Sequence, residues 1–111
     1  MNAAALAERL EAVIADKKGR DITVLDLQGT GAITDYFIIV TGSSTPHLKA
    51  MAEDAYVTLK REGIECFRRS GEADGGWIVL DYIDVVLHIF TTEKRDYYQL
   101  EALWAEAPRV A

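Results

Sequence analysis

The stretch from Tyr36 to Thr41 reads Tyr-Phe-Ile-Ile-Val-Thr, an unbroken run of apolar and β-branched residues. A strand with one face in water alternates apolar and polar side chains, whereas a strand covered on both faces is apolar throughout. The run therefore predicts a strand in the middle of a sheet, with packing on both sides. Such a strand belongs to a layered fold in which helices cover the sheet.

The rest of the chain predicts the elements around this strand from its hydrophobic spacing. Strands are expected over residues 21–27, 36–41, 64–69, 76–82 and 85–90, and helices over 3–17, 46–62 and 93–104. The order α-β-β-α-β-β-β-α predicts an α/β fold with a mixed sheet and flanking helices.

Turn and capping residues mark the ends of these elements. Asn2 is expected to cap the first helix, and Thr45 to cap the second, with Pro46 as its first helical residue. In the last helix the helical spacing predicts four inward side chains and packing roles for the aromatic residues: Tyr97, Leu100, Leu103 and Trp104.

Length and charge limit the class of protein. A chain of 111 residues suits one domain, expected over 1–106, with a short C-terminal tail over 107–111. Its 18 acidic and 12 basic residues give a net charge of −6, which disfavours broad binding to nucleic acid and leaves a basic protein or a small substrate as partner. No apolar run approaches the roughly 18 residues of a membrane span, and no secretory signal is found, so the expected location is cytoplasmic.

Cysteine and histidine provide no metal or nucleophile motif. The single cysteine, Cys66, cannot form an intramolecular disulfide, and its place in a predicted strand favours a packed thiol over a nucleophile. His47 and His88 lack zinc-type spacing. No metal and no cofactor are expected, and His47 is interpreted as a surface residue.

Gly42 and Ser43 lie where a strand passes into a helix, a position that can bind phosphate through backbone N–H groups. Nucleotidyltransferases use a Gly-Ser pair there together with two strand carboxylates spaced Asp-x-Asp, which hold Mg²⁺. The nearest candidates are Asp81 and Asp84, and no Asp-x-Asp occurs in the chain. The favoured reading is a tight turn at Gly42, with Ser43 or Thr45 as the helix cap.

Residues 76–90 predict a β-hairpin with an unusual face. A two-residue turn at Tyr82-Ile83 would pair 81 with 84, 79 with 86 and 77 with 88. One face would then be aliphatic core, and the other would hold a mixed set: Trp77, Val79, Asp81, Asp84, Val86 and His88. Aromatic anchors beside charges are typical of protein interfaces. The alternative is a half-covered face in which Trp77 packs under a loop and His88 is a stacked structural residue.

Three segments resemble the ribosomal silencing factor family RsfS, also called Iojap or YbeB. They are Ile33–Phe37 continuing to Thr41–Ser44, Gly76–Tyr82 with Asp84–Phe90, and Tyr97–Trp104. The resemblance spans nearly the whole chain in the right order. One departure is Ile83, where the family usually has glycine.

The resemblance implies a nucleotidyltransferase-like fold without catalytic acids, and therefore no enzyme activity. It implies binding to the large ribosomal subunit through ribosomal protein fourteen, a block of subunit joining, repression of translation, and a homodimer. The second segment would face the partner, which assigns partner binding to five residues: Trp77, Asp81, Tyr82, Asp84 and His88. Two other hypotheses stay open: a degenerate nucleotide-binding enzyme that uses Gly42, Ser43 and the acids, and a dimerisation module with no ribosomal role.

Overall fold

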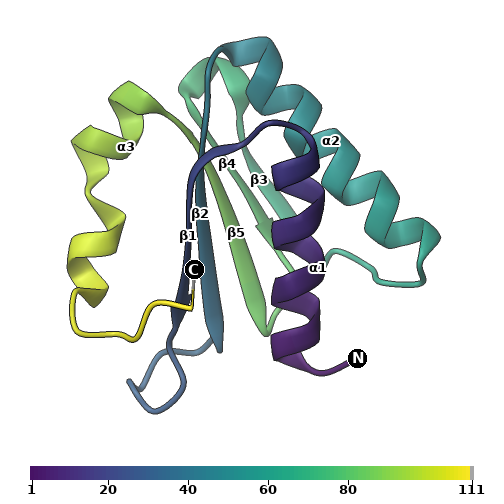
Figure 1. Ribbon diagram of the computed structural model, residues 1–111. Helices are drawn as coiled ribbons and strands as arrows, with labels where there is room; N and C mark the ends of the chain where they lie inside the picture. The colour runs from purple at the N-terminus through teal and green to yellow at the C-terminus, as the bar shows by residue number, and fades with distance from the viewer. Residues whose placement is uncertain (111) are drawn as a thin grey trace.

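A five-stranded sheet in the order β1-β2-β5-β4-β3 runs through the middle of the molecule (Figure 1). The computed structural model describes residues 1–110. The strands are β1 (Arg20–Asp26), β2 (Tyr36–Gly42), β3 (Arg68–Glu72), β4 (Trp77–Asp81) and β5 (Val85–Thr91). The helices are α1 (Ala3–Asp16), α2 (Thr45–Arg61) and α3 (Thr92–Tyr98), with short 3₁₀ segments η1 (Ala73–Gly75) and η2 (Leu100–Trp104). Strands β2 and β5 are parallel and the other neighbours are antiparallel, so the expected mixed α/β sheet is confirmed.

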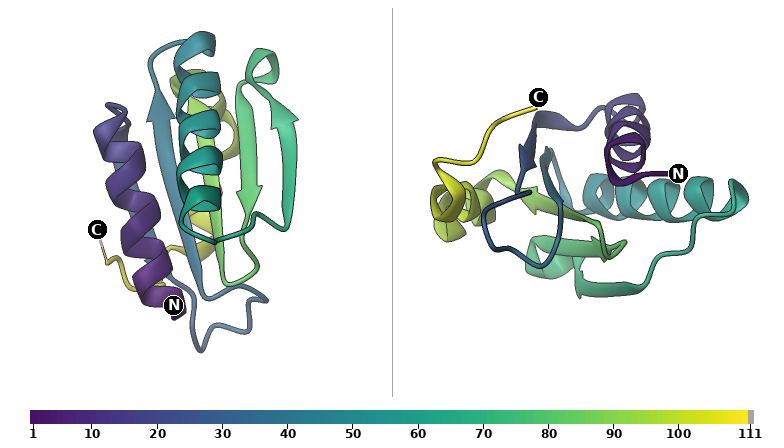
Figure 2. Two further views of the ribbon diagram at one scale, coloured as in Figure 1. Left: turned by 90° about the vertical axis from the view of Figure 1, so that its right-hand side faces the viewer. Right: turned by 90° about the horizontal axis from the view of Figure 1, so that it is seen from below.

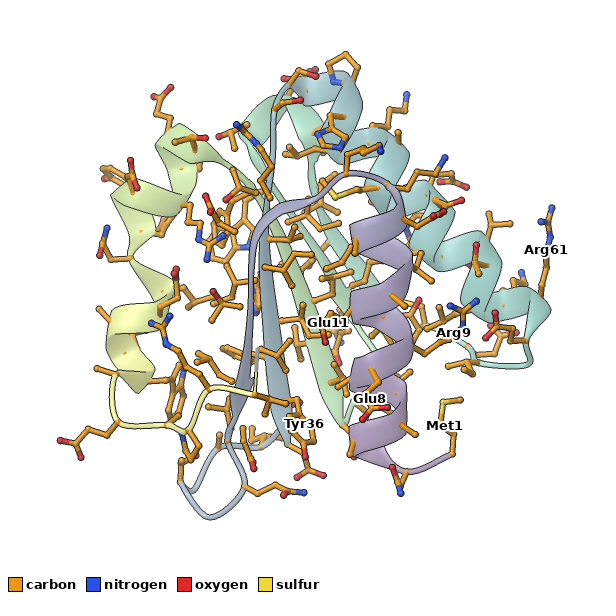
Figure 3. All side chains as sticks on the ribbon, in the orientation of Figure 1. Met1, Glu8, Arg9, Glu11, Tyr36 and Arg61 are labelled. Carbon is orange, nitrogen blue, oxygen red and sulfur yellow. The ribbon has the colours of Figure 1, made fainter. Side chains whose placement is uncertain are left out.

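The helices form a layer on each side of the sheet. Helices α1 and α2 cover one face, while α3 and η2 lie against the other (Figures 1 and 2). Figure 3 shows side chains filling the space on both sides. The central strand β2 serves both layers: Ile38 and Val40 pack with α1 and α2, and Ile39 packs on the opposite side, all with 0% exposure. The apolar run is thus explained by burial on both faces.

Two helix caps fix the start of α1 and α2. The Asn2 side chain accepts a hydrogen bond from the Ala5 N–H at 2.8 Å, as predicted. The cap of α2 is Ser44, whose Oγ accepts from the His47 N–H, whereas Thr45 is already inside the helix. The prediction named Thr45 or Ser43 and so missed the cap by one residue on either side, because all three hydroxyl residues can cap a helix and only the backbone path distinguishes them.

His47 is half-buried and joins α2 to the end of α1, in contrast to the predicted surface position. Its Nδ1 accepts a hydrogen bond from the Ser43 N–H at 2.9 Å, so its Nε2 carries the proton and donates to the Lys17 carbonyl at 2.7 Å. Both ring nitrogens of the neutral side chain are therefore satisfied within the fold.

The third strand lies further along the chain than predicted. Helix α2 ends in a turn in which the Ile64 N–H donates to the Leu59 carbonyl, and the following residues carry the chain to the edge of the sheet before β3 begins at Arg68. All five residues of β3 are exposed. Because β3 is held by backbone pairing with β4 and not by buried side chains, its sequence has no apolar alternation that could have revealed it.

The predicted last helix is broken into α3 and η2. Gln99 adopts φ +49°, in the left-handed region, and ends α3. Tyr98, at the end of α3, contacts Trp77, and after the break Leu100 and Trp104 pack against the sheet. Tyr97 and Leu103 are 75% and 73% exposed. The prediction of inward Tyr97 and Leu103 is wrong, because it assumed one continuous helical face.

The C-terminal segment lies beside β1. The Asp26 N–H donates to the Pro108 carbonyl at 2.9 Å, and the Val110 N–H donates to the Val24 carbonyl at 2.8 Å. Ala107 is buried against the face of the sheet that α3 and η2 cover. The segment expected as a tail is therefore attached to the sheet as far as Val110. None of the helices within residues 1–110 combines the length and apolarity that crossing a bilayer requires.

Candidate partner-binding face

The candidate site occupies the face of β4 and β5 that points away from α1 and α2. The observed register pairs Trp77 with Phe90, Val79 with His88 and Asp81 with Val86, a shift of two residues from the predicted pairing. Because side chains alternate with a period of two, an even shift leaves every strand residue on its predicted face. The aliphatic core face is also as predicted, and its members are buried: Ile78, Leu80, Val85, Leu87 and Ile89.

The hairpin turn is centred on Ile83, one residue later than predicted. The Tyr82 N–H donates to the Val85 carbonyl, and the Asp84 N–H donates back to the Tyr82 carbonyl at 2.9 Å. Ile83 has φ +73°, which together with this i to i+2 bond describes a γ-turn. Asp81 and Asp84 are therefore not cross-strand partners as expected, since Asp84 belongs to the turn.

Trp77 is half-buried in a cluster of aromatic rings. Its ring stacks on Phe90, with centroids 4.9 Å apart, and lies 4.7 Å from the ring of Tyr98 on α3. Its Nε1–H donates to His88 Nδ1 at 3.2 Å. Trp77 fits both hypotheses for this face in part. Helix α3 covers some of the indole, as a half-covered face requires, and the rest of the indole reaches the surface, where a partner could contact it.

His88 is a buried, neutral member of the same cluster. Its ring is 6% exposed and lies edge-on to Phe37 at 4.7 Å. Burial lowers the His88 pKa to about 4, while the nearby negative charge of Asp81 acts weakly in the opposite direction. His88 Nε2 is buried without a hydrogen-bond partner in the described chain. A surface donor that titrates near neutral pH does not fit this geometry.

The remaining predicted residues separate into two groups. Asp84 is exposed, and Asp81 is half-buried with one carboxylate oxygen accepting from the Ile83 N–H at 2.7 Å. Tyr82 is 6% exposed and packs in the core under α2, on the opposite side of the sheet from Trp77. Burial raises the pKa of its hydroxyl, which has no hydrogen-bond partner in the described chain.

Beside the acids, the open part of this face contains an apolar hollow that the sequence did not reveal. Its volume is about 560 Å³. It is lined by Ala32, Ile33, Thr34, Phe37, Phe67, Asp81, Ile83, Val86 and Trp104. Ile33, Phe67 and Ile83 are 103%, 61% and 57% exposed, so a group of large apolar side chains faces solvent next to the Asp81 carboxylate. The lining comes from four stretches that are far apart in the sequence, residues 32–37, 67, 81–86 and 104, which is why no local pattern predicted it.

A polar network centred on Arg95 holds α3 and η2 over the inner part of this face. Arg95 donates to the Asp21 carbonyl at 2.7 Å and to the hydroxyls of Thr41 and Thr23 on the sheet. Its Nε and Nη2 also donate to the Glu101 carboxylate at 3.0–3.3 Å. The network fixes the position of Tyr98 and Trp104 against Trp77 and Phe37.

The residues of the nucleotide-binding hypothesis are not brought together. Gly42 ends β2 beside Thr91, whereas the Asp84 carbonyl accepts hydrogen bonds at the opposite end of β2, from Asp35 and Tyr36. A Cβ on Gly42 would lie 2.4 Å from a methyl carbon of Leu48, so this glycine permits close packing of α2.

The thiol and metal candidates are equally unsupported by the geometry. Cys66 is half-buried, and burial raises the pKa of its thiol, the opposite of an activated nucleophile. Within residues 1–110, no three histidine, cysteine or carboxylate side chains gather as they would around a metal ion.

The fold and this face define a small α/β domain in which one apolar and acidic surface is left open to solvent. A family model described as "Ribosomal silencing factor during starvation" (RsfS) matches residues 1–111. The chain belongs to the RsfS family. It is 34% identical to "Ribosomal silencing factor RsfS" of Bacillus subtilis, covering 97% of this chain and 92% of that one, and 40% identical to the protein of that name from Haemophilus influenzae, covering 91% and 99%.

Solved structures agree with this assignment. A crystal structure of protein CV0518 from Chromobacterium violaceum superposes with a TM-score of 0.90 at 33% identity, over 95% of this chain and 88% of that one. A protein from Bacillus halodurans superposes with a TM-score of 0.85 at 31% identity, over 97% and 98%. The chain is also 32% identical to "Mitochondrial assembly of ribosomal large subunit protein 1" of Mus musculus, over 87% of this chain and 44% of that one.

Proposed function

We propose that this protein is a ribosomal silencing factor of the cytoplasm that binds the large ribosomal subunit through its protein fourteen. Bound there, it blocks joining of the small subunit by occupying space, and so represses translation without catalysing a reaction. The observation that carries the proposal is the open face, where Asp81 lines an apolar hollow and Asp84 is exposed in the turn that follows β4. The names of the relatives, which refer to ribosomal silencing and to the large subunit, support it.

The hollow and the acids would make different contributions to binding. An apolar side chain of the partner would fill the hollow between Ile33, Phe67 and Trp104, which removes apolar surface from water and supplies most of the affinity. Asp84 and the free oxygen of Asp81 would bind lysine or arginine at the rim, which fixes the orientation of the complex.

Of the other three residues assigned to partner binding, only Trp77 would contact the partner directly. The exposed edge of Trp77 would extend the apolar contact beyond the hollow. His88 and Tyr82 are buried, so they would hold β4 and β5 in place and not touch the partner. The net charge of −6 would favour encounter with a basic protein surface and disfavour ribosomal RNA.

The test is co-sedimentation of the protein with purified large subunits. Ile33→Asp places a charge in the hollow at a fully exposed position, so binding should weaken at least about tenfold while the fold stays intact. Asp84→Lys should weaken binding and reduce its dependence on salt. The matched control is Leu103→Asp, at a largely exposed apolar residue that does not line the hollow.

Blocking is measured by adding small subunits and separating the particles on a sucrose gradient. The wild type should keep the subunits apart, and Ile33→Asp should not. Wild-type protein that fails to pellet with large subunits would contradict the proposed partner. Protein that pellets but leaves subunit joining unchanged would contradict the blocking mechanism.

A further inference from the structure

Ile83 combines a β-branched side chain with a left-handed backbone. Its φ is +73°, and the Asp84 N–H closes the turn around it by donating to the Tyr82 carbonyl at 2.9 Å. A γ-turn of this sign is rare and strained, and a residue with a branched Cβ tolerates it poorly. The other non-glycine residues with positive φ within residues 1–110 have unbranched Cβ atoms: Lys18, Asp21 and Gln99.

Hydrogen bonds on both sides of Ile83 fix the turn in this strained form. The Ile83 N–H donates to the Asp81 carboxylate at 2.7 Å. The Asp84 carbonyl accepts hydrogen bonds from the N–H groups of Asp35 and Tyr36 at 3.0 and 3.1 Å, which attaches the turn to the start of β2. A strained residue persists where its surroundings determine its conformation in this way, and such residues cluster at binding and active sites.

The Ile83 side chain does not compensate for the strain by packing in the core. It is 57% exposed, and it belongs to neither of the two clusters of packed apolar side chains within residues 1–110. It lines the apolar hollow together with Ile33 and Phe67. The free protein therefore carries both a strained backbone and exposed apolar surface at this position. An apolar group placed in the hollow would cover that surface.

The geometry of Ile83 suits a preformed wall of a binding site. The fixed turn determines the direction of its Cα–Cβ bond, and branching at Cβ restricts rotation about χ1. A side chain that is already ordered loses little entropy when a partner packs against it, so more of the contact energy appears as affinity. Glycine at this position would leave one side of the hollow open, and alanine would supply only a methyl group.

We propose that Ile83 determines the affinity and selectivity of the hollow for an apolar side chain of the ribosomal partner, an assignment that rests on the proposed function because it concerns the same face. The turn costs the folded protein stability, and the complex gains contact with a rigid apolar wall. The same wall disfavours a polar or charged group, since such a group would lose its water against Ile33, Phe67 and Ile83 and find no hydrogen-bond partner in their side chains.

The test compares three variants in their stability and in their affinity for purified large subunits. Ile83→Gly should raise the ratio of folded to unfolded protein about fivefold and also raise the dissociation constant about tenfold. Ile83→Ala keeps the strained φ, so it should weaken binding to a similar extent without the full gain in stability. Ile83→Val keeps the branched Cβ and should bind within about fourfold of the wild type.

The opposite movement of stability and affinity in Ile83→Gly is the expected signature of a wall built for binding. A residue with a purely structural role would lose stability and affinity together. The matched control is Val110→Ala, because Val110 is a β-branched residue with 59% exposure that does not line the hollow. This variant should leave the dissociation constant unchanged.

Two results would overturn the role of Ile83 while leaving the proposed function in place. In the first, the wild type and Ile83→Gly pellet equally well with large subunits. In the second, Ile83→Gly loses binding and Ile83→Ala keeps it, which would mean that a rigid backbone and not the side chain sets the affinity. A wild type that does not pellet with large subunits overturns both this assignment and the proposed function.

Discussion

At the scale of single residues, burial decides the chemistry of His88. An isolated histidine titrates near pH 6.5, but here the ring is enclosed by Phe37, Phe90 and Trp77, and its pKa is lowered to about 4. Trp77 donates to Nδ1, which requires the neutral form with its proton on Nε2. Protonation would place a second N–H against the indole N–H.

This predicts that the protein loses stability in mild acid. As pH falls from about 6.5 to about 4, the unfolded chain binds a proton at His88 and the folded chain does not, so the free energy of unfolding falls by up to about 3 kcal/mol. The contribution is complete above pH 6.5. Urea unfolding of wild type and His88→Gln across this range measures it. The wild type should lose more stability than the variant, and parallel curves would show that His88 does not titrate in this way.

Alternation also sorted most of the predicted site residues correctly. Trp77, Asp81 and His88 lie on one face of the hairpin as expected, since their side was set by parity along the strand. An odd or even position along the strand determines the face on which a side chain lies, but it does not determine how deeply that side chain is buried. His88 is enclosed because the rings of Phe37, Trp77 and Phe90 surround it. Tyr98 of α3 packs on Trp77 and Phe90, so the burial of His88 depends on contacts between distant segments.

At the scale of elements, the turn between β4 and β5 accepts a strained residue. Ile83 is β-branched and has φ +73°, a conformation that costs a non-glycine residue about 1–2 kcal/mol. The two-residue shift in register follows from this turn, because a γ-turn at Ile83 lets Tyr82 pair with Val85. Glycine would adopt this φ without strain.

Ile83→Gly is therefore expected to stabilise the protein by about 1 kcal/mol, the relief of strain minus the greater entropy of glycine in the unfolded chain. Chemical denaturation measures the change. The matched control is Ile83→Ala, which keeps a Cβ and should recover much less. Equal gains in both variants would show that the effect comes from removing an exposed apolar side chain and not from the backbone angle.

At the scale of the whole molecule, the C-terminal segment connects the layer formed by α3 and η2 to strand β1. Beyond the Arg95 network, residues 107–110 follow β1 and cover Leu25 and Leu27, each 1% exposed. The segment contributes two backbone hydrogen bonds and a buried Ala107. It therefore forms part of the core on this side.

Deletion of residues 107–111 is expected to cost about 2 kcal/mol, through exposed leucine surface and lost hydrogen bonds, and to lower the melting temperature by about 10 °C. Differential scanning calorimetry measures this. Replacing Pro108 and Arg109 with alanine keeps the backbone groups and should have a small effect. An unchanged melting temperature on deletion would mean that these residues act as the tail that the sequence suggested.

Much of the fold could be predicted because its causes are local. The helices α1 and α2, the central strand β2 and the faces of β4 and β5 follow from apolar spacing, which records burial directly. Strand β3 and the break at Gln99 could not be predicted in this way, since backbone pairing and a single left-handed residue determine them and neither leaves a periodic pattern.

The sequence by itself determined the order of most elements, the side of the sheet on which each residue of β4 and β5 lies, and the family to which the motifs point. The tertiary structure alone decided that four distant stretches of the chain meet in one apolar hollow, that Tyr82 lies on the far side of the sheet from Trp77, and that β3 is left as a free edge. Periodicity depends on neighbours three or four residues apart, whereas hollows, edges and burial depths depend on contacts between distant segments, which form only when the whole chain packs.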